Sequence, residues 1–186
     1  MDEKDTYGLI TRFNAITAVS RKVHGSAGIF DIPLPLMGSP GIECRDGGAT
    51  GDYQVVIIFP TAVTTAQAQI TQGTGTASST TVATNEVIVN LTGVTDGQTL
   101  QVTVAAVNDG TQANNITIPL QILVGDTNNN GAVNSSDVGQ TKGDSGQTTK
   151  ATNFRRDVNA NGTINSSDVS IVKAKSGGAA TAKKPR

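Results

Sequence analysis

Two stretches of the chain repeat one another closely, and both are rich in residues that offer oxygen atoms. Residues 126–137 read DTNNNGAVNSSD, and residues 157–168 read DVNANGTINSSD. Carboxylate, amide and main-chain carbonyl oxygens are the ligands that hard cations such as Ca²⁺ prefer. The chemistry that these stretches offer is therefore the binding of a divalent cation by oxygen.

The spacing of these residues matches a 12-residue calcium loop, which binds through positions 1, 3, 5, 7 and 12 and has a glycine at position 6. The sequence predicts two Ca²⁺ ions, held by Asp126, Asn128, Asn130, the carbonyl of Ala132 and Asp137 in the first loop, and by Asp157, Asn159, Asn161, the carbonyl of Thr163 and Asp168 in the second. The alternative is a pair of surface turns that bind nothing, since Asn, Asp, Ser and Gly all favour turns.

Position 8 of each loop is apolar and β-branched, with Val133 in the first copy and Ile164 in the second. Such residues favour extended backbone. We expect them to form a short strand-like contact that holds the two loops back to back. Each loop has only two carboxylates, which predicts weaker binding than in loops with more, and favours extracellular calcium.

Residues 125–176 resemble type I dockerins, in which two calcium loops are each followed by a helix. The resemblance rests on the repeated loop and on Asp, instead of the Glu of typical EF-hands, at position 12. It implies a non-catalytic module that binds Ca²⁺ and docks onto a cohesin-like protein domain. The positions that correspond to partner-contacting residues are Ser135, Ser136 and Lys142 in the first repeat and Ser166, Ser167 and Lys173 in the second.

The segment after the first loop departs from this pattern. It contains Gly139 and Gly143, and it has Gln140 and Thr141 where the second repeat has two apolar residues. Glycine lowers helix propensity, and polar residues reduce contact with a core. We therefore expect the second helix to be the better docking helix.

The part of the chain upstream of the repeat must carry this module, and its pattern is that of β structure. Seven or so short apolar and β-branched segments are separated by Gly, Asn and Asp turn signals. Residues 27–36 predict an edge strand because of Pro33 and Pro35, and the apolar run 55–59 predicts a central strand. The segment 38–52 is Gly-rich and predicts a loop.

The predicted fold class is mainly β: an immunoglobulin-like β-sandwich followed by a small α-helical, dockerin-like module with two calcium loops. A β-barrel is the alternative for the upstream part. The expected divisions are a lead-in segment (1–25), the sandwich (26–124), the module (125–176) and a disordered tail (177–186). The lead-in is too weakly patterned to predict a helix or a strand.

Charge and composition exclude several function classes. The net charge is −1 and the isoelectric point is about 5.7, which argues against nucleic-acid binding. No apolar run approaches the roughly 18 residues needed for membrane insertion, and an export signal would lie upstream of this chain. With one cysteine and one histidine a zinc site is not expected, and we interpret Cys44 as buried and inert and His24 as structural.

The sandwich has few carboxylates, Glu43 among them, and their positions favour turns and caps over a catalytic pair. The sequence predicts no enzyme. It predicts an extracellular or cell-surface docking module of an exported bacterial protein, with a role in polysaccharide degradation as a further expectation. The alternative is a calcium-stabilised structural subunit that packs on its own or a neighbouring β-sandwich.

Overall fold

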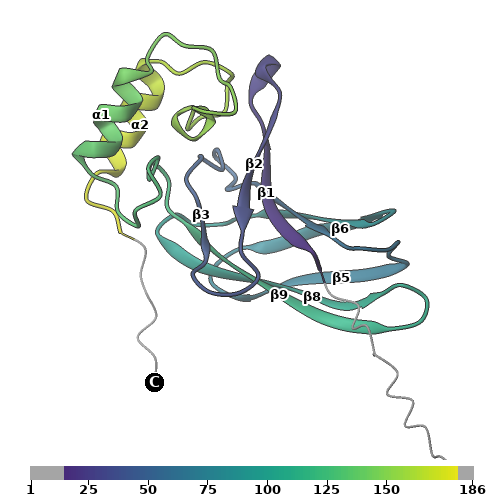
Figure 1. Cartoon of the computed structure of the whole chain (residues 1–186). Coiled ribbons are helices and arrows are strands. Elements are labelled where there is room, and N and C mark those ends of the chain that lie inside the picture. The colour runs from purple at the N-terminus through teal and green to yellow at the C-terminus, as the bar shows by residue number, and fades with distance from the viewer. Residues whose placement is uncertain (1–14, 180–186) are drawn as a thin grey trace, which may run out of the picture.

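The computed structural model describes residues 15–179, and it places two β-sheets beside a pair of short helices (Figure 1). The helices are α1 (Ser135–Gly143) and α2 (Ser166–Lys175), with 3-10 turns η1 (Gly25–Ala27) and η2 (Phe154–Arg156). The strands are β1 (Thr17–Val23), β2 (Ile29–Leu34), β3 (Gly41–Glu43), β4 (Tyr53–Ile58), β5 (Thr65–Gln72), β6 (Thr76–Ala83), β7 (Glu86–Thr92), β8 (Gln98–Asn108) and β9 (Ala113–Ile122). This mainly β fold with helices at its end confirms the predicted fold class.

The strands form a five-stranded sheet in the order β2-β1-β4-β7-β6 and a four-stranded sheet in the order β3-β9-β8-β5. Alternate side chains of both sheets point into one apolar core, as in Val87, Val89 and Leu91 of β7. The predicted central strand is β4, which lies between β1 and β7, and the predicted edge strand is β2. Pro33 is compatible with an edge because it has no N–H to donate.

Strand β1 lies within the segment that the sequence set apart as a lead-in, since residues 17–23 pair with both β2 and β4. Its inward-facing residues are Ala18 and Ser20, both buried. Because Ala18 is small and Ser20 is polar, the sequence of β1 lacks the apolar alternation that predicts a strand. Residues 1–14 lie outside the part of the chain that the structure describes.

Strand β3 is a second difference, because it lies in the segment predicted as a Gly-rich loop. Its three residues pair in parallel with β9. Glu43, interpreted from the sequence as a turn or cap residue, is wholly buried in this strand. Three residues that begin with a glycine directly after Pro40 are too few for a periodic signal.

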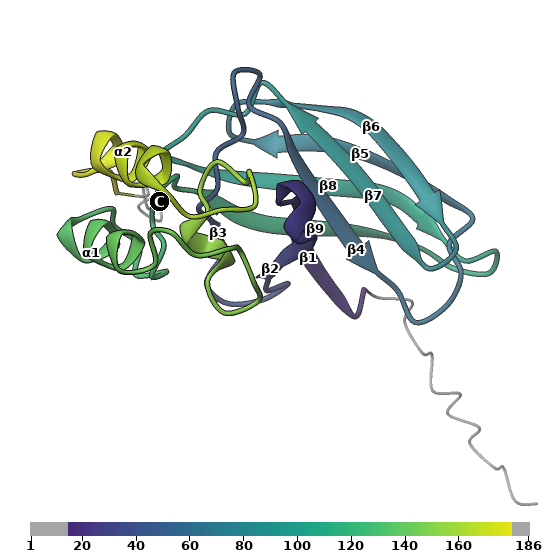
Figure 2. The same cartoon turned by 90° about the horizontal axis from the view of Figure 1, so that it is seen from above.

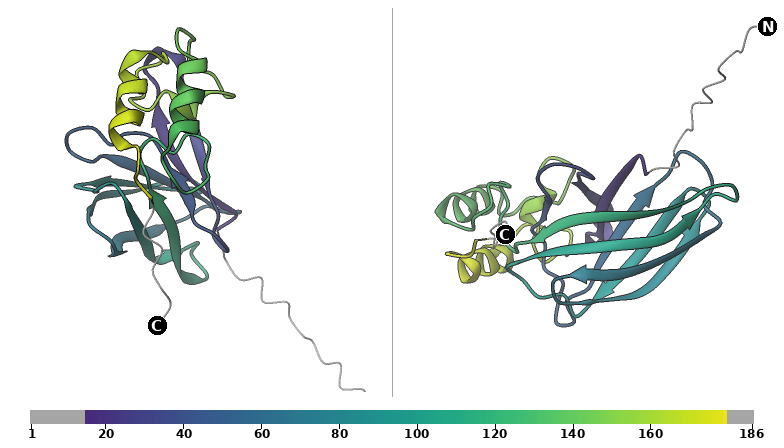
Figure 3. Two further views of the ribbon diagram at one scale, coloured as in Figure 1. Left: turned by 90° about the vertical axis from the view of Figure 1, so that its left-hand side faces the viewer. Right: turned by 90° about the horizontal axis from the view of Figure 1, so that it is seen from below.

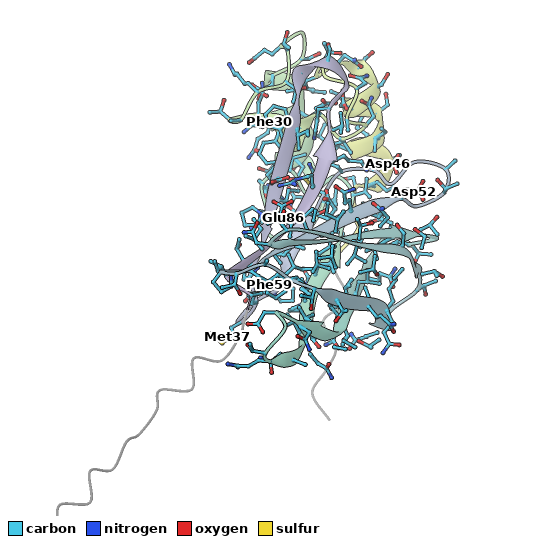
Figure 4. The ribbon with its side chains drawn as sticks, turned by 90° about the vertical axis from the view of Figure 1, so that its right-hand side faces the viewer. Phe30, Met37, Asp46, Asp52, Phe59 and Glu86 are labelled. Carbon is cyan, nitrogen blue, oxygen red and sulfur yellow. The ribbon has the colours of Figure 1, made fainter. Side chains whose placement is uncertain are left out.

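The hairpin of β1 and β2 extends past the rest of its sheet. The pairing of β1 with β4 ends at Arg21, whereas its pairing with β2 continues to Val23 and Ile29. The tip, which includes η1, therefore reaches the helical module (Figures 1 and 2). In Figure 4, Phe30 lies at this end of the hairpin and Phe59 lies within the sandwich.

A second, smaller core joins the sandwich to the module. It contains Ile42 of β3, Leu123 and Val124 after β9, and three buried residues of the module, which are Val133, Val158 and Val172. Because side chains from both parts fill one cluster, the module is packed against the sandwich. No helix among the described residues is long and apolar enough to cross a bilayer.

Candidate metal centre

Each repeat folds around the carboxylate of its first residue. Asp126 accepts hydrogen bonds from the main-chain N–H groups of Asn130, at 3.1 Å, and Gly131, at 2.8 Å. Asp157 accepts the corresponding bonds from Asn161 and Gly162, at 3.0 and 2.9 Å. The two loops thus have the same local structure, as the repeated sequence predicts.

The asparagines at positions 3 and 5 fold the loop further. The side-chain oxygen of Asn128 accepts from the N–H of Asn130, and that of Asn130 accepts from the N–H of Ala132. The second loop repeats both bonds. These are Asx turns, which fix side-chain oxygens close to the main chain.

The position-12 carboxylates close the loops. Asp137 accepts from the N–H of Asn128 and the N–H of Asn134, at 3.1 and 3.0 Å, and the second loop has the same two bonds to Asp168. Asn134 in turn caps helix α1, so the predicted ligand Asp137 also belongs to a capping box. Sequence reasoning missed the role of this asparagine and of Asn165, although Asn-x-x-Asp before a helix is a recognisable cap.

Two residues per loop have positive φ: Asn129 and Gly131 in the first loop, and Ala160 and Gly162 in the second. Glycine adopts this geometry readily, which explains its place at position 6. Ala160, at φ 54°, is strained there by its β-carbon. Strain of this kind is maintained where the surrounding structure requires the loop shape.

The four carboxylates of the loops carry an electrostatic cost. Asp126, Asp137, Asp157 and Asp168 are all fully buried. Burial raises the pKa of Asp168, and the negative charge of Asp157 acts in the same direction. Among the described residues, none of these four carboxylates pairs with a lysine or arginine side chain, and Asp157 alone contacts a ring nitrogen, that of His24.

Buried carboxylates without cationic side chains beside them suit a bound cation, and the remaining oxygens come from amides and main-chain carbonyls. This donor set fits Ca²⁺. No group of three His, Cys, Asp or Glu side chains gathers as a metal site within residues 15–179, because each loop has only two carboxylates. In each loop the residues that would hold the ion are those at positions 1, 3, 5, 7 and 12.

The position-8 residues do not pair the two loops with one another, contrary to the expectation. Val133 exchanges main-chain hydrogen bonds with residues 177–178, which follow α2. Ile164 exchanges the same bonds with residues 146–147, which follow α1. Each loop is therefore hydrogen-bonded to the residues that follow the other repeat's helix.

This pairing also places the start of the predicted tail. Ala179 forms a β-bridge with Ala132, so residues 177–179 are part of the module's structure. Residues 180–186 of that tail lie outside the described residues.

The sandwich contributes residues that sequence reasoning did not assign to the site. His24, at the hairpin tip, has its Nδ1 atom 2.8 Å from Oδ2 of Asp157. Thr149, in the segment between the repeats, donates to the same oxygen at 2.6 Å. Burial would raise the pKa of Asp157, but these two hydrogen bonds and that of Gly162 hold it below its usual range. No local pattern predicts the His24 contact, because the two residues are 133 positions apart.

Arg155 of η2 contacts both the first loop and the sandwich. Its Nη2 atom donates to the carbonyl oxygens of Ile42 and Asp126, at 3.1 and 3.2 Å. This side chain thus links the first loop to β3. Cys44, which directly follows β3, is buried, and burial raises the pKa of its thiol to about 11.

The residues that the resemblance marks as partner-binding lie on α1 and α2, and their side chains are exposed: Ser135, Ser136, Lys142, Ser166, Ser167 and Lys173. The helices stand side by side, and the views in Figure 3 show that they lie at the end of the molecule (Figure 3). The described contacts with the sandwich involve the loops, η2, the residues after β9 and the inner face of α2. The outer helix faces are therefore free for contact with another molecule.

A family model describing the dockerin type I domain matches residues 124–175. Comparison with curated proteins and with solved structures gives no match for the chain. The match and the repeated loop geometry agree on the same residues. Over residues 124–175 the chain is thus similar to a dockerin type I domain, which supports a calcium-binding docking module in this part of the chain.

Proposed function

We propose that the chain is a non-catalytic anchoring unit, in which residues 125–176 bind two Ca²⁺ ions and dock a separate cohesin-like domain. The observation that carries this proposal is the free outer surface of both helices, with their exposed serines and lysines, beside loops built from calcium-type ligands. Residues 17–122 form the sandwich that presents this module. The docking helix is α2, because Val169 and Val172 anchor its inner face in the core.

The proposed calcium ligands are those predicted from the sequence, and calorimetry tests them. A titration of the chain with Ca²⁺ is compared with the double variant Asp126→Asn, Asp157→Asn, and Asp109→Asn is the control for loss of one charge far from the loops. Two sites in the unchanged chain, lost in the double variant and kept in the control, support the proposal. Equal titrations of all three proteins contradict it.

Partner binding is tested separately with a panel of purified type I cohesin domains in calcium and in chelator. Ser166→Ala with Ser167→Ala should weaken binding at least tenfold if α2 is the docking helix, whereas the same changes at Ser135 and Ser136 should have a smaller effect. Failure of every cohesin to bind would contradict docking of this kind. The wider setting that we propose is an exported protein that acts in polysaccharide degradation, and fractionation of the producing cells tests the export.

A second candidate is a calcium-stabilised structural subunit, and one observation favours it. The module already packs on its own sandwich through the shared apolar cluster and the His24–Asp157 contact. Light scattering over a calcium series separates the two candidates: a docking unit stays monomeric, and a self-associating subunit grows in mass as calcium rises.

A further inference from the structure

The two calcium loops differ in what surrounds the carboxylate of their first residue. In the described chain, Asp126 accepts hydrogen bonds from N–H groups of its own loop. Asp157 accepts the equivalent bonds and, in addition, a bond from His24 of the sandwich. Both partners of this added bond are fully buried. The second loop is therefore completed by a side chain from outside the module.

The hydrogen bonds that Asp157 accepts are distributed unequally between its two carboxylate oxygens. Oδ2 receives three donors, which are His24 Nδ1 at 2.8 Å, Thr149 Oγ1 at 2.6 Å and Gly162 N at 2.9 Å. Oδ1 receives one, from Asn161 N at 3.0 Å. A carboxylate has about four lone-pair sites over its two oxygens. Oδ2 is saturated, so Oδ1 is the atom that remains free to bind a cation.

The partners of His24 fix its tautomer. Nη1 of Arg45 lies 3.3 Å from the second ring nitrogen, Nε2, and a guanidinium can only donate. Nε2 therefore accepts, Nδ1 carries the hydrogen, and the imidazole that faces Asp157 is neutral. Glu43 pairs with Arg45 at 2.6 Å and balances its charge. The sandwich thus adds a donor beside the loop without adding a net positive charge that would repel a cation.

Packing holds this imidazole in place. Its ring meets Phe30 edge-on, at 5.2 Å between ring centres, and Phe154 in the same way at 6.1 Å. The hairpin tip also touches the loop directly, because a β-carbon on Gly25 would lie 2.2 Å from the carbonyl oxygen of Asn161. These contacts fix the position of the donor beside Asp157.

We propose that His24 is a positioning residue of the second calcium loop, which makes that loop the tighter of the two and couples its ion to the sandwich. The inference rests on the proposed function, since it requires that the loops bind Ca²⁺. Outer partners of metal ligands typically contribute 10- to 100-fold in metal affinity. By reciprocity, an ion in the second loop stabilises the hairpin tip by the same factor.

The test measures the calcium affinity of each loop alone, by competition with a chelating dye. Asp137→Asn disables the first loop, and Asp168→Asn disables the second while leaving Asp157 in place. With the second loop intact, His24→Leu should weaken binding by about 10- to 100-fold. With the first loop intact, it should change binding less than twofold. His24→Asn, which keeps a donor near the position of Nδ1, should restore affinity to within about threefold of that of the parent.

An equal loss at both loops, or no loss at the second, would overturn the proposal and leave the proposed function intact. Absence of calcium binding at either loop of the unchanged chain would overturn both. Hydrogen exchange gives a test that needs no change at His24. Calcium should slow exchange of the His24 and Ala27 amides, which bond within the tip, at least tenfold in Asp137→Asn and not in Asp168→Asn. Equal slowing in both variants, or none in Asp137→Asn, would also overturn the proposal.

Discussion

Arg45 is a charged side chain with no exposed surface, and its hydrogen bonds explain why it is tolerated. It donates to both carboxylate oxygens of Glu43, to the carbonyl oxygens of Ser20 and Phe30, and to His24. A buried ion pair gives little net stability, but removal of one partner leaves an unpaired charge. These residues therefore fix the position of the hairpin more than they strengthen the fold.

The first prediction concerns Glu43→Gln, which should lower the free energy of unfolding by about 3 kcal/mol at neutral pH, because Arg45 loses its counter-charge. Burial would raise the pKa of Glu43, but the charge and hydrogen bonds of Arg45 and the bond from Ser20 hold it below the ordinary value of 4.5. The contribution is therefore full above pH 4.5 and is lost as pH falls through the lower folded value.

Denaturant unfolding of the parent and Glu43→Gln over a pH series measures this. The gap between them should be constant above the ordinary carboxyl pKa and should shrink in acid. The control is Glu86→Gln, whose partly exposed carboxylate lies 3.7 Å from Arg21 and should change stability by less than about 1 kcal/mol. A gap of the same size in strong acid would contradict the account.

At the scale of elements, the hairpin tip and the second loop approach one another more closely than any side chain would allow. Gly131 and Gly162 occupy the same loop position, with φ of 86° and 96°. A β-carbon on Gly131 would meet nothing within 4 Å, whereas one on Gly162 would lie 2.9 Å from the carbonyl oxygen of His24. The two positions therefore have the same left-handed backbone geometry, but only Gly162 has a backbone atom close to where a β-carbon would lie.

The second prediction uses this matched pair. Gly131→Ala should cost about 1–2 kcal/mol from the left-handed backbone alone. Gly162→Ala should cost at least about 1 kcal/mol more, because the hairpin must move away from the loop. Thermal unfolding of both variants in saturating calcium measures the difference. An equal loss of stability in the two variants would show that the hairpin can move away from the loop at no cost in free energy.

Helix α1 gives the third prediction. Gly139 lies on its exposed side, and a β-carbon there would meet nothing within 4 Å. Gly139→Ala should stabilise the chain by about 0.8–1 kcal/mol, because alanine has the higher helix propensity. The control is Gly146→Ala, which has equal space but a φ of 93° and should destabilise. Denaturant unfolding in calcium measures both, and a loss of stability in Gly139→Ala would contradict the prediction.

Some of the structural elements could be predicted from the sequence and others could not. Strands with apolar alternation, such as β7, and the repeated loops were predictable because their signal is local and periodic. Strand β1 was not, since its buried Ser20 is satisfied by Glu43, a partner distant in the chain. For the same reason the calcium ligands were predicted by spacing, whereas His24 and Arg155 depend on contacts that only the folded chain brings together.

At the scale of the whole molecule, the sandwich and the module share contacts along their boundary. Beyond the common apolar cluster, Lys175 of α2 pairs with Asp96 at 2.9 Å, and the N–H of Asp46 bonds to the carbonyl oxygen of Val158 at 2.7 Å. Asp96 also accepts from the N–H of Val124. Loss of order in the module would therefore expose apolar surface of the sandwich.

The fourth prediction is that calcium decides whether the two parts unfold together. Ions bound only by the folded loops stabilise the module by about 2.7 kcal/mol per site at a hundredfold excess over the dissociation constant. Without them, the buried loop carboxylates destabilise it, while the separate core of the sandwich remains. Scanning calorimetry should give one transition in saturating calcium and a lower, split or broadened one in chelator. Two well-separated transitions in calcium would instead show that the boundary contacts do not couple the sandwich to its module.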